Sequence, residues 1–422
     1  MKNQLRKIII FRSTFMNINT KKLTLQYCIL QGAYWASFCI IYSFATVFLL
    51  DRGFYNSQIG VIIAAGNILG VIFQPVFASV VDRSKTVTLH KLTAILAVVM
   101  VVLLLLLYGL PNQFLAVAVI FLLTDTLLQV IQPLINSVSV YYVNRGVNVD
   151  FGAARGIGSL SYALVSYLLG GLVENYGCSM ILFAGILMVL VICITVFSMP
   201  IIKDAVFSGK EQEMKSEINA DRGQSVQEKE SLLSFIGRYK YFMLTLAGVT
   251  LVFSFHNMNN SYMIQIITNV GGTSADLGRL LAIAAITEIP VMFLFSRVVK
   301  YVKSSVLLII SGIFFALKAF GYFAAGNIAL MTVAAVMQMG SFALYIPASV
   351  YYVNEVMEEQ DKFKGQALMT GTNTLGGMIG SLLGGFLIDH AGVAVMNLAG
   401  LIMAVSGAVL IALFVSRQKP VI

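Results

Sequence analysis

Twelve long apolar segments constrain the fold of this chain more than any other feature. A helix needs about 20 predominantly apolar residues to cross the hydrocarbon core of a bilayer. Backbone polar groups in that medium must be paired inside the protein, so such segments cross it as helices. We therefore expect twelve membrane-spanning helices, at residues 24–50, 58–81, 88–109, 113–143, 153–173, 179–199, 241–268, 275–297, 305–325, 328–354, 366–387 and 392–415.

The distribution of charge predicts how these helices are oriented. Only 11% of the residues are charged, against about 25% in a soluble domain. The net charge of +9 could by itself indicate a nucleic-acid partner. However, 24 of the 28 Lys and Arg residues fall in tails and loops that a count of twelve spans places on one side. An excess of Lys and Arg marks the cytoplasmic side, so we expect both termini in the cytoplasm and no nucleic-acid partner.

A repeated hexamer indicates that the chain contains two related halves. SVYYVN occurs at residues 139–144 and again at 349–354, and SYLLGGLVENYG in the first half is matched by GSLLGGFLIDHAG in the second. Six spans separate the copies, so both enter the membrane from the same side. A parallel repeat of this kind is typical of transporters whose binding site lies between the halves, near the bilayer midplane.

A polar segment separates six spans from six spans. It is rich in Glu, Lys, Gln and Ser, and such a composition cannot bury enough apolar surface to become ordered by itself. The expected fold is an all-α membrane protein built from two six-helix bundles. Its expected parts are a cytoplasmic tail (1–22), a first bundle (23–200), a cytoplasmic linker (201–237), a second bundle (238–415) and a C-terminal tail (416–422).

Polar residues recur at helical spacing inside the first, fourth and fifth predicted helices of each half. Charged and polar side chains are costly in hydrocarbon, so those that line up on one face are expected to face protein or water. A short stripe could also be hydrogen bonding between helices, but six equivalent stripes favour a shared aqueous cavity. The stripes contain Tyr27, Gln31, Tyr34, Trp35 and Phe38; Asp125, Gln129, Gln132 and Asn136; Arg155, Ser159, Tyr162 and Ser166; His256, Asn259, Asn260 and Met263; Gln338, Ser341, Tyr345 and Tyr352; and Gln366, Thr370 and Asn373.

The chemistry of these stripes favours a neutral, polar ligand. Amides and hydroxyls can both donate and accept hydrogen bonds, and aromatic faces can stack on sugar or base rings. Arg155 is the one cation clearly placed in the stripes, so a strongly anionic substrate is disfavoured.

Ionisable residues in other predicted helices allow two interpretations each. Glu288 and Lys318 could form a structural ion pair, or Glu288 could carry a transported proton. His256 could contact ligand or protons, or it could be a buried His with its hydrogen bonds satisfied. The sequence contains no nucleotide-binding loop, zinc-protease or serine-hydrolase motif. We therefore expect neither an enzyme nor a cofactor or metal.

Four segments carry a family resemblance. They are NSQIGVIIAAGNILGVIFQPVFASVVDRSK, DFGAARGIGSLSYALVSYLLG, AAITEIPVMF and SGIFFALKAFG. They resemble the second, fifth, eighth and ninth helices of the major facilitator superfamily, in the branch around lactose permease and the oligosaccharide:proton symporters. The resemblance spans residues 24–415 and implies a secondary transporter that works by alternating access. It also implies a conformational latch at Asp82 and Arg83, where Ala78 replaces the family's usual Gly.

The resemblance also assigns roles to residues. Arg155 stands where the family's fifth-helix Arg binds sugar hydroxyls, and Tyr162 stands where an aromatic ring stacks on the sugar. Glu288 matches the eighth-helix carboxylate that contacts sugar and links it to proton movement. Lys318 replaces the family's Arg on the ninth helix.

The chain departs from the family at several charged positions. The fourth-helix carboxylate falls at Asn136 or Ser137, and the tenth-helix His and carboxylate fall at Gln338 and Ser341. The charge pairs between the seventh and eleventh helices are likewise replaced by polar residues: His256, Asn259 and Asn373. Polarity is kept and charge is lost.

Taken together, these patterns predict a monomeric importer of the bacterial inner membrane that moves a neutral polar solute, such as a sugar or glycoside, with protons. Expected proton-coupling residues are Glu288 and Lys318, with Asp125 and His256 as substitutes. An exporter of drugs or metabolites and an importer of nucleosides or aromatic acids remain alternatives. A membrane sensor is disfavoured, because segment 201–237 is too short and polar for an output domain. Expected substrate contacts are Arg155, Tyr162, Asn136, Trp35, Gln31, Asn259, Gln338 and Asn373.

Overall fold

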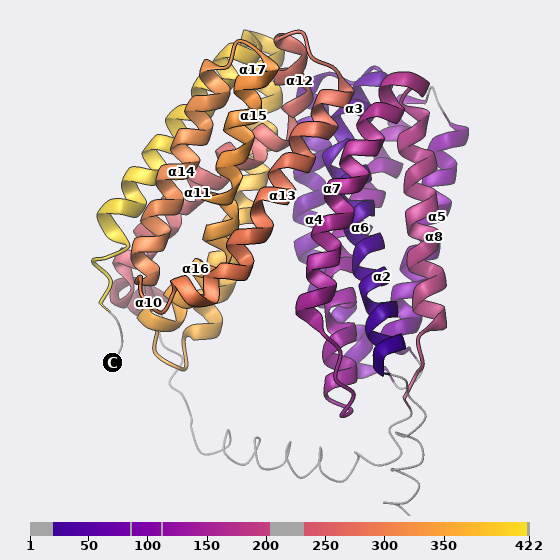
Figure 1. The fold of residues 1–422 in the computed structure, drawn as a ribbon, viewed down its shortest axis with the longest axis horizontal. Coiled ribbons are helices and arrows are strands. Elements are labelled where there is room, and N and C mark those ends of the chain that lie inside the picture. Colours follow the sequence, from indigo (N-terminus) through magenta and orange to yellow (C-terminus); the bar gives the residue numbers. More distant parts are fainter. Residues whose placement is uncertain (1–19, 85–86, 111–112, 203–231, 420–422) are drawn as a thin grey trace, which may run out of the picture.

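The computed structural model describes residues 20–84, 87–110, 113–202 and 232–419, which form helices and no strands (Figure 1). The first half contains α2 (Thr20–Phe38), η1 (Cys39–Ser43), α3 (Ala45–Asp51), α4 (Asn56–Arg83), α5 (Leu89–Gly109), α6 (Phe114–Val143), α7 (Phe151–Tyr176) and α8 (Ser179–Ser198). The second half contains α10 (Leu232–Arg238), α11 (Lys240–Ser261), α12 (Met263–Asn269), α13 (Ser274–Val298), α14 (Ser304–Ala324), α15 (Ile328–Val336), η2 (Met337–Met339), α16 (Phe342–Val356) and α17 (Lys362–Phe414).

The helices of the described residues account for all twelve predicted spans. Ten helices are long and apolar enough to cross a membrane, and the bent pair formed by α2–η1 and α3 adds an eleventh. One of the ten, α17, has 53 residues, which is about 80 Å of helix against about 30 Å of hydrocarbon. Gly392, with φ of 84°, breaks α17 into two spans. Gly177 has φ of 86° at the matching turn of the first half, so the repeat extends to the backbone.

Three spans are interrupted where the sequence pattern predicts continuous helices. The seventh breaks at Tyr262, whose φ of −113° and ψ of 21° separate α11 from α12. The first span bends by 44° directly after the π-helical turn η1. The tenth span changes to the 3₁₀ turn η2, and Ser341 then leaves the helical region with φ −87° and ψ −91°. Gly340 lies so close to Phe314 that a Cβ atom there would meet the ring at 2.3 Å. Short π and 3₁₀ turns within helices often mark functional positions.

The second tyrosine of the repeated hexamer holds the last helix of its own half. The Tyr142 hydroxyl donates to the carbonyl oxygen of Pro200 at 2.8 Å, just beyond α8. The Tyr352 hydroxyl donates to the carbonyl oxygen of Val415 at 3.0 Å, at the end of α17. Both side chains are buried. The hexamer therefore has the same packing role in both halves.

The two halves lie against each other at one end of the molecule. In Figure 1 their ribbons are close where α3 and α12 are labelled, and they diverge toward the opposite end. We call the end at which α3 and α12 lie the closed end; it carries the turns at 52–55, 270–273 and 389–391. We call the second the linker end; it carries Ile202 and Leu232, which flank the predicted linker.

Hydrogen bonds join the halves at the closed end. The Gln265 amide donates to Asn56 Oδ1 at 2.6 Å, and the Asn56 amide donates to Asp389 Oδ1 at 2.8 Å. The Thr273 hydroxyl donates to Glu174 Oε2 at 2.9 Å. Because each bond links one half to the other, they hold the closed end together.

Glycines allow helices of the two halves to touch where the halves pack against each other. A Cβ atom on Gly278 of α13 would lie 2.2 Å from the carbonyl oxygen of Ser166 and 3.0 Å from Gly170 Cα, both on α7. A Cβ atom on Gly60 of α4 would lie 2.3 Å from the carbonyl oxygen of Ser381 on α17. Small residues let membrane helices approach this closely, so α7 packs on α13 and α4 packs on α17.

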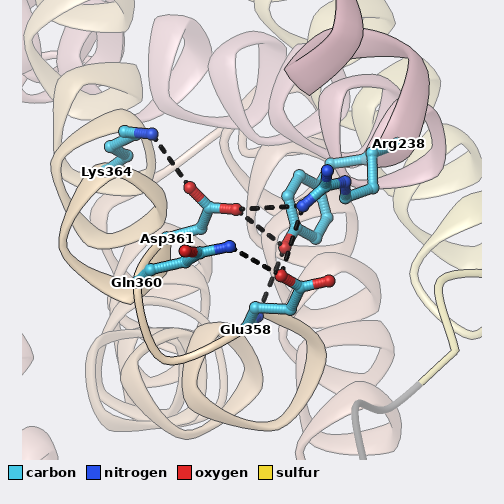
Figure 2. Close-up of polar contacts among 6 residues, drawn as sticks. Arg238, Glu358, Gln360, Asp361 and Lys364 are labelled. Atoms are coloured by element: carbon cyan, nitrogen blue, oxygen red, sulfur yellow. Dashed lines mark hydrogen bonds and ion pairs between the residues drawn. The ribbon is translucent and has the colours of Figure 1, made fainter. Parts of the chain in front are cut away.

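A charged cluster at the linker end ties α10 to the loop between α16 and α17 (Figure 2). Asp361 is 1% exposed, accepts hydrogen bonds from Lys364 Nζ at 2.9 Å and the Tyr239 hydroxyl at 3.1 Å, and lies 3.8 Å from Arg238 Nη1. Arg238 also pairs with Glu358 at 3.2 Å. Helix α10 overlaps the end of the predicted linker 201–237, whose residues 203–231 lie outside the described part of the chain. The cluster therefore fixes the end of that segment to the second half.

Apolar side chains cover the outer surface of the helices. Leu164, Phe183, Phe293 and Ile402 are all more than half exposed. An apolar surface of this extent is unusual for a protein in water and is what contact with lipid requires. The polar stripes therefore have to be accommodated between the helices.

Candidate functional site

Arg155 and Trp35 form the centre of the polar face of the first half. The guanidinium carbon of Arg155 on α7 lies 4.0 Å from the centroid of the Trp35 ring on α2, which is cation–π geometry. Arg155 Nη1 also donates to Ser159 Oγ at 2.9 Å, one turn further along α7. A Cβ atom on Gly158 would lie 2.5 Å from Trp35 Cδ1, so glycine is needed for α7 to lie against the ring.

A second polar group lies on the same helix as Trp35. The Gln31 amide nitrogen donates to the Tyr27 hydroxyl at 2.8 Å and to Asn136 Oδ1 at 3.0 Å. Gln31 Oε1 is buried and has no hydrogen-bond partner among the described residues, and the same is true of Trp35 Nε1. These two atoms are one buried acceptor and one buried donor without a protein partner in the described residues.

Gln338 connects the two buried charges of the second half. Lys318 Nζ on α14 donates to Gln338 Oε1 at 2.5 Å, and Gln338 Nε2 donates to Glu288 Oε1 on α13 at 2.8 Å. The direct ion pair considered from the sequence is absent from the described residues, because the Gln338 amide lies between the two charges. An amide has a donor and an acceptor, so it can satisfy an ammonium group and a carboxylate at once. Gln338 belongs to η2, so the break in the tenth span carries this bridge.

Arg155 of the first half and Glu288 of the second half lie on α7 and α13, two helices that pack against each other. Tyr162 and Ala163 of α7 pack against Ala282 and Ala285 of α13. Arg155 and Glu288 lie close enough across this contact for their opposite charges to interact. A cation from the first half and a carboxylate from the second half therefore lie near the contact between the bundles, where the sequence predicts the site.

Tyr162 is fixed from its own half by the π-helical turn. Its hydroxyl shares a 2.8 Å hydrogen bond with Ser43 Oγ, in the last residue of η1. The sequence pattern did not single out Ser43, because a π turn shifts the helical register and carries no compositional signal. Phe38 and Tyr42 stack beside it with ring centroids 4.9 Å apart.

Asp125 and His256 are both buried. Neither carboxylate oxygen of Asp125 has a hydrogen-bond partner in the described residues. The His256 ring stacks on Phe342 with centroids 5.0 Å apart, and its Nε2 lies 3.1 Å from the Asn260 amide nitrogen. His256 thus lies among aromatic rings of the second half.

The polar residues of the seventh and eleventh spans pair differently from the predicted pattern. Asn257 Nδ2 donates to Asn373 Oδ1 at 3.1 Å, so Asn257 rather than Asn259 connects α11 to α17. Asn259 instead borders a cavity of about 10 Å³, next to Tyr322 of α14 and Asn397 of α17. Asn257 could not be singled out from the sequence, because four polar residues within 256–260 fit more than one helical face.

The predicted latch lies near the limit of the described structure. Arg83 is the last residue of α4 and is exposed. The side chain of Asp82 is outside the described part of the chain, as are residues 85 and 86. The latch therefore remains a prediction.

Comparison with known proteins decides the family. The family model described as the MFS_1 like family matches residues 26–399, which is most of the chain. The protein belongs to the MFS_1 like family. It is therefore a multi-pass membrane transporter of the major facilitator type rather than an enzyme, as the sequence predicts.

Two curated relatives of this MFS_1 like chain are similar over nearly their full length. Maltose permease of Geobacillus stearothermophilus is 24% identical over 392 residues, covering 90% of this chain and 93% of the relative. The uncharacterized transporter YwbF of Bacillus subtilis (strain 168) is 22% identical over 390 residues, covering 90% of this chain and 91% of the relative. Both are bacterial transporters by name.

Solved structures share the fold of this MFS_1 like protein. A mutant form of the nucleoside transporter NupG superposes with a TM-score of 0.74 at 15% identity, covering 95% of this chain and all of that one. A D-xylose-proton symporter superposes with a TM-score of 0.65 at 13% identity, covering 93% and 97%. At these identities the similarity establishes the fold and leaves the substrate open.

Proposed function

We propose that this transporter imports a neutral polar solute, such as a sugar or glycoside, together with protons, across the bacterial inner membrane. The observation that carries the proposal is the arrangement of Arg155 on the Trp35 ring, opposite Glu288 of the other half. A guanidinium, an aromatic face and a carboxylate that lie near one another suit a ligand that has hydroxyl groups and a ring.

The remaining predicted contacts complete this proposed site. Hydroxyl groups of the solute would hydrogen-bond to Arg155, Asn136 and Glu288, and Tyr162 and Trp35 would contact its ring. Gln31, with a free carbonyl oxygen, would accept a further hydrogen bond. The proposed solute contacts on the second half are Gln338, Asn259 and Asn373. No single one of them is essential to the proposal.

Glu288 is the proton-coupling residue that we propose. Lys318 would adjust the proton affinity of Glu288, because a nearby cation favours the charged carboxylate. The Gln338 amide bridges the two groups. Asp125 and His256 are the substitutes. A solute that bonds to Glu288 and Arg155 would change the environment of the carboxyl, so that solute and proton bind in a linked manner.

The proposed membrane orientation places the linker end in the cytoplasm, because most Lys and Arg residues of the described part of the chain lie there. With the halves in contact at the closed end, the described conformation corresponds to an inward-facing state. Asp82 and Arg83 would act as a latch at the linker end. We propose a monomer, since one chain supplies both halves of the site, with the domain limits given above: 1–22, 23–200, 201–237, 238–415 and 416–422.

Relatives support the solute class without deciding it. Maltose permease is the more similar of the two curated relatives named above, and a D-xylose-proton symporter shares the fold. A nucleoside transporter shares the fold as well, so import of nucleosides is the alternative that the test has to separate. A third candidate function is import of aromatic acids, and a fourth is export of drugs or metabolites.

The test is proton uptake by de-energised cells that express the protein in weak buffer. Maltose, other sugars, glycosides, nucleosides and aromatic acids are added one class at a time, and external pH is recorded. We expect external alkalinisation with a sugar or glycoside and none in the Glu288→Gln variant. That variant should still exchange labelled for unlabelled solute, because solute exchange needs no net proton movement.

A matched control separates loss of coupling from loss of protein. Glu359→Gln removes a carboxylate that is 90% exposed in the loop before α17, and it should behave like the unmodified protein. Alkalinisation with nucleosides alone would contradict the proposed solute class. Concentration of solute against a gradient by Glu288→Gln would show that Glu288 is not the coupling residue.

A further inference from the structure

Asp125 of α6 has an unusual environment for a carboxyl group. It is 1% exposed, and neither oxygen has a hydrogen-bond partner among the described residues. Gly66 of α4 lies directly against it: a Cβ atom there would be 2.1 Å from Asp125 Oδ2. Gln129, one turn along α6, lies close enough to interact with the carboxyl, but its amide donates to Asn67 Oδ1 at 2.6 Å. The carboxyl is therefore enclosed and almost unsolvated.

This environment favours one protonation state of Asp125 over the other. An ionised carboxylate that is buried without a partner is far more costly than the neutral acid, because nothing replaces its hydration. A carboxyl buried in this way therefore keeps its proton and remains neutral. The geometry around Asp125 therefore stabilises the protonated acid in the conformation described here.

The other groups that face Asp125 give no alternative partner. Tyr34 of α2 and Tyr42 of η1 are the titratable groups close enough to interact with it, and both are neutral phenols at physiological pH. Helix α4 presents Gly66 and Asn67, which do not titrate. Arg155 is close enough to interact with Tyr34, and its guanidinium lies on Trp35 and donates to Ser159.

A metal cation fits this position less well than a proton. Cations such as Na⁺, Mg²⁺ and Ca²⁺ need several oxygen ligands. The described residues contain no group of three or more His, Cys, Asp or Glu side chains that could hold a metal ion. Gly66 contributes only backbone at the carboxyl. A proton needs one oxygen and no further space.

The position of α4 connects Asp125 to the contact between the halves. Gly66 faces Asp125 on one side of α4, and the next residue, Asn67, accepts from Gln129 and faces Gly377 of α17. A Cβ atom on Gly377 would lie 3.1 Å from Asn67 Nδ2. Helix α4 therefore lies between the carboxyl and the second half, and separating α4 from α17 would change the enclosure of Asp125.

We propose that Asp125 is a second proton-binding site, located in the first half and separate from Glu288, which is loaded while α4 is packed against α17 and exchanges its proton when the halves separate there. The inference deepens the proposed function, because it adds a second coupling group to the one proposed at Glu288. The two carboxyls belong to different bundles, so each half would carry its own titrating group.

The test is infrared spectroscopy of the purified full-length protein in lipid, without any solute. A protonated carboxyl has a C=O stretching band that an ionised carboxylate lacks. We expect such a band at neutral pH and its loss in Asp125→Asn. The band should persist in Glu288→Gln, which isolates the signal of Asp125. In Glu359→Gln, which removes a carboxylate that is 90% exposed in the loop before α17, the acid band should be unchanged.

Three outcomes would overturn the inference. An unchanged acid band in Asp125→Asn would mean that Asp125 is ionised. A band of Asp125 that decreases when Na⁺ replaces choline at constant pH would identify a cation site instead. If Asp125→Asn does not fold, the unmodified protein and Glu288→Gln still decide the matter, because absence of any acid band from Glu288→Gln at neutral pH also contradicts a protonated Asp125. The experiment uses no solute, so its failure is independent of the solute proposal.

Discussion

The carboxylate of Asp389 in the second half accepts a hydrogen bond from the backbone amide of Ser57 in the first half, at 2.7 Å. The backbone amide and the side-chain amide of Asn56 donate to the same carboxylate at 3.2 and 2.8 Å. Asn56 and Ser57 begin α4, so Asp389 caps this helix from the other half. An anion at a helix N-terminus interacts favourably with its free N–H groups and its dipole. A single carboxylate thereby links the two halves at the closed end.

Asp389→Asn should weaken closure of the closed end. The neutral amide loses the charge-assisted hydrogen bonds, and because Asp389 is exposed the loss is up to about 1 kcal/mol, or about fivefold in the equilibrium between closed and open forms. Spin labels at Gln113 and Gly326, both exposed at this end on opposite halves, should show more of the longer distance. Asp51→Asn, an exposed carboxylate at the same end, is the control. Identical distance distributions for the Asp389 variant and the control would contradict the assignment.

Gly278→Ala should hold the closed end open. The added Cβ atom would lie 2.2 Å from the carbonyl oxygen of Ser166, so α13 and α7 could not keep their present contact. Gly171→Ala is the matched control, because a Cβ atom there meets nothing within 4 Å. We expect solute transport to fall at least tenfold in Gly278→Ala and to change little in Gly171→Ala. Equal transport by both variants would show that the α7–α13 contact is dispensable.

Tyr352→Phe should destabilise the second half without affecting the site. It removes the hydrogen bond to the carbonyl oxygen of Val415, which is worth about 0.5–1.5 kcal/mol. The adjacent Tyr351→Phe is the control, since Tyr351 is 44% exposed and packs on Phe295 through its ring. Thermal unfolding in detergent should occur at a lower temperature for Tyr352→Phe only. Tyr142→Phe should reproduce the effect in the first half.

Gln338→Met should lower both stability and transport. Methionine keeps the size of the side chain but leaves Lys318 and Glu288 without their shared partner, and each lost bond to a buried charged group costs about 1.5–3 kcal/mol. Gln360→Met removes a similar hydrogen bond, to Glu358 at 2.9 Å, at an exposed position, and serves as the control. Thermal unfolding and solute uptake measured on both variants test the bridge. A Gln338 variant as stable as the control would mean that the two charges find other partners.

The sequence was sufficient to predict the spans, the repeat and the family. Spans follow from local composition, because hydrocarbon allows a backbone few alternatives to a helix. The repeat follows from direct comparison of the two halves, and the structure adds its cause: Tyr142 and Tyr352 fasten the last helix of each half. The stripes on the first, fourth and fifth helices also led to Arg155 and Trp35.

Pairings between helices could not be predicted in the same way. The π turn that brings Ser43 to Tyr162 shifts the helical register without a change in composition. The 3₁₀ turn at Gln338 likewise depends on packing of Gly340 against Phe314. A sequence pattern gives the face on which a residue lies, and its partner depends on how two helices are rotated against each other. For that reason the amide bridge between Glu288 and Lys318 became visible only in three dimensions.

Trp35 is the single tryptophan of the chain, and it lies beneath the guanidinium of Arg155. All tryptophan fluorescence of this transporter therefore arises at the candidate site. A solute that draws Arg155 away from the indole ring would change the emission without any attached dye. The protein thus carries its own optical reporter of binding.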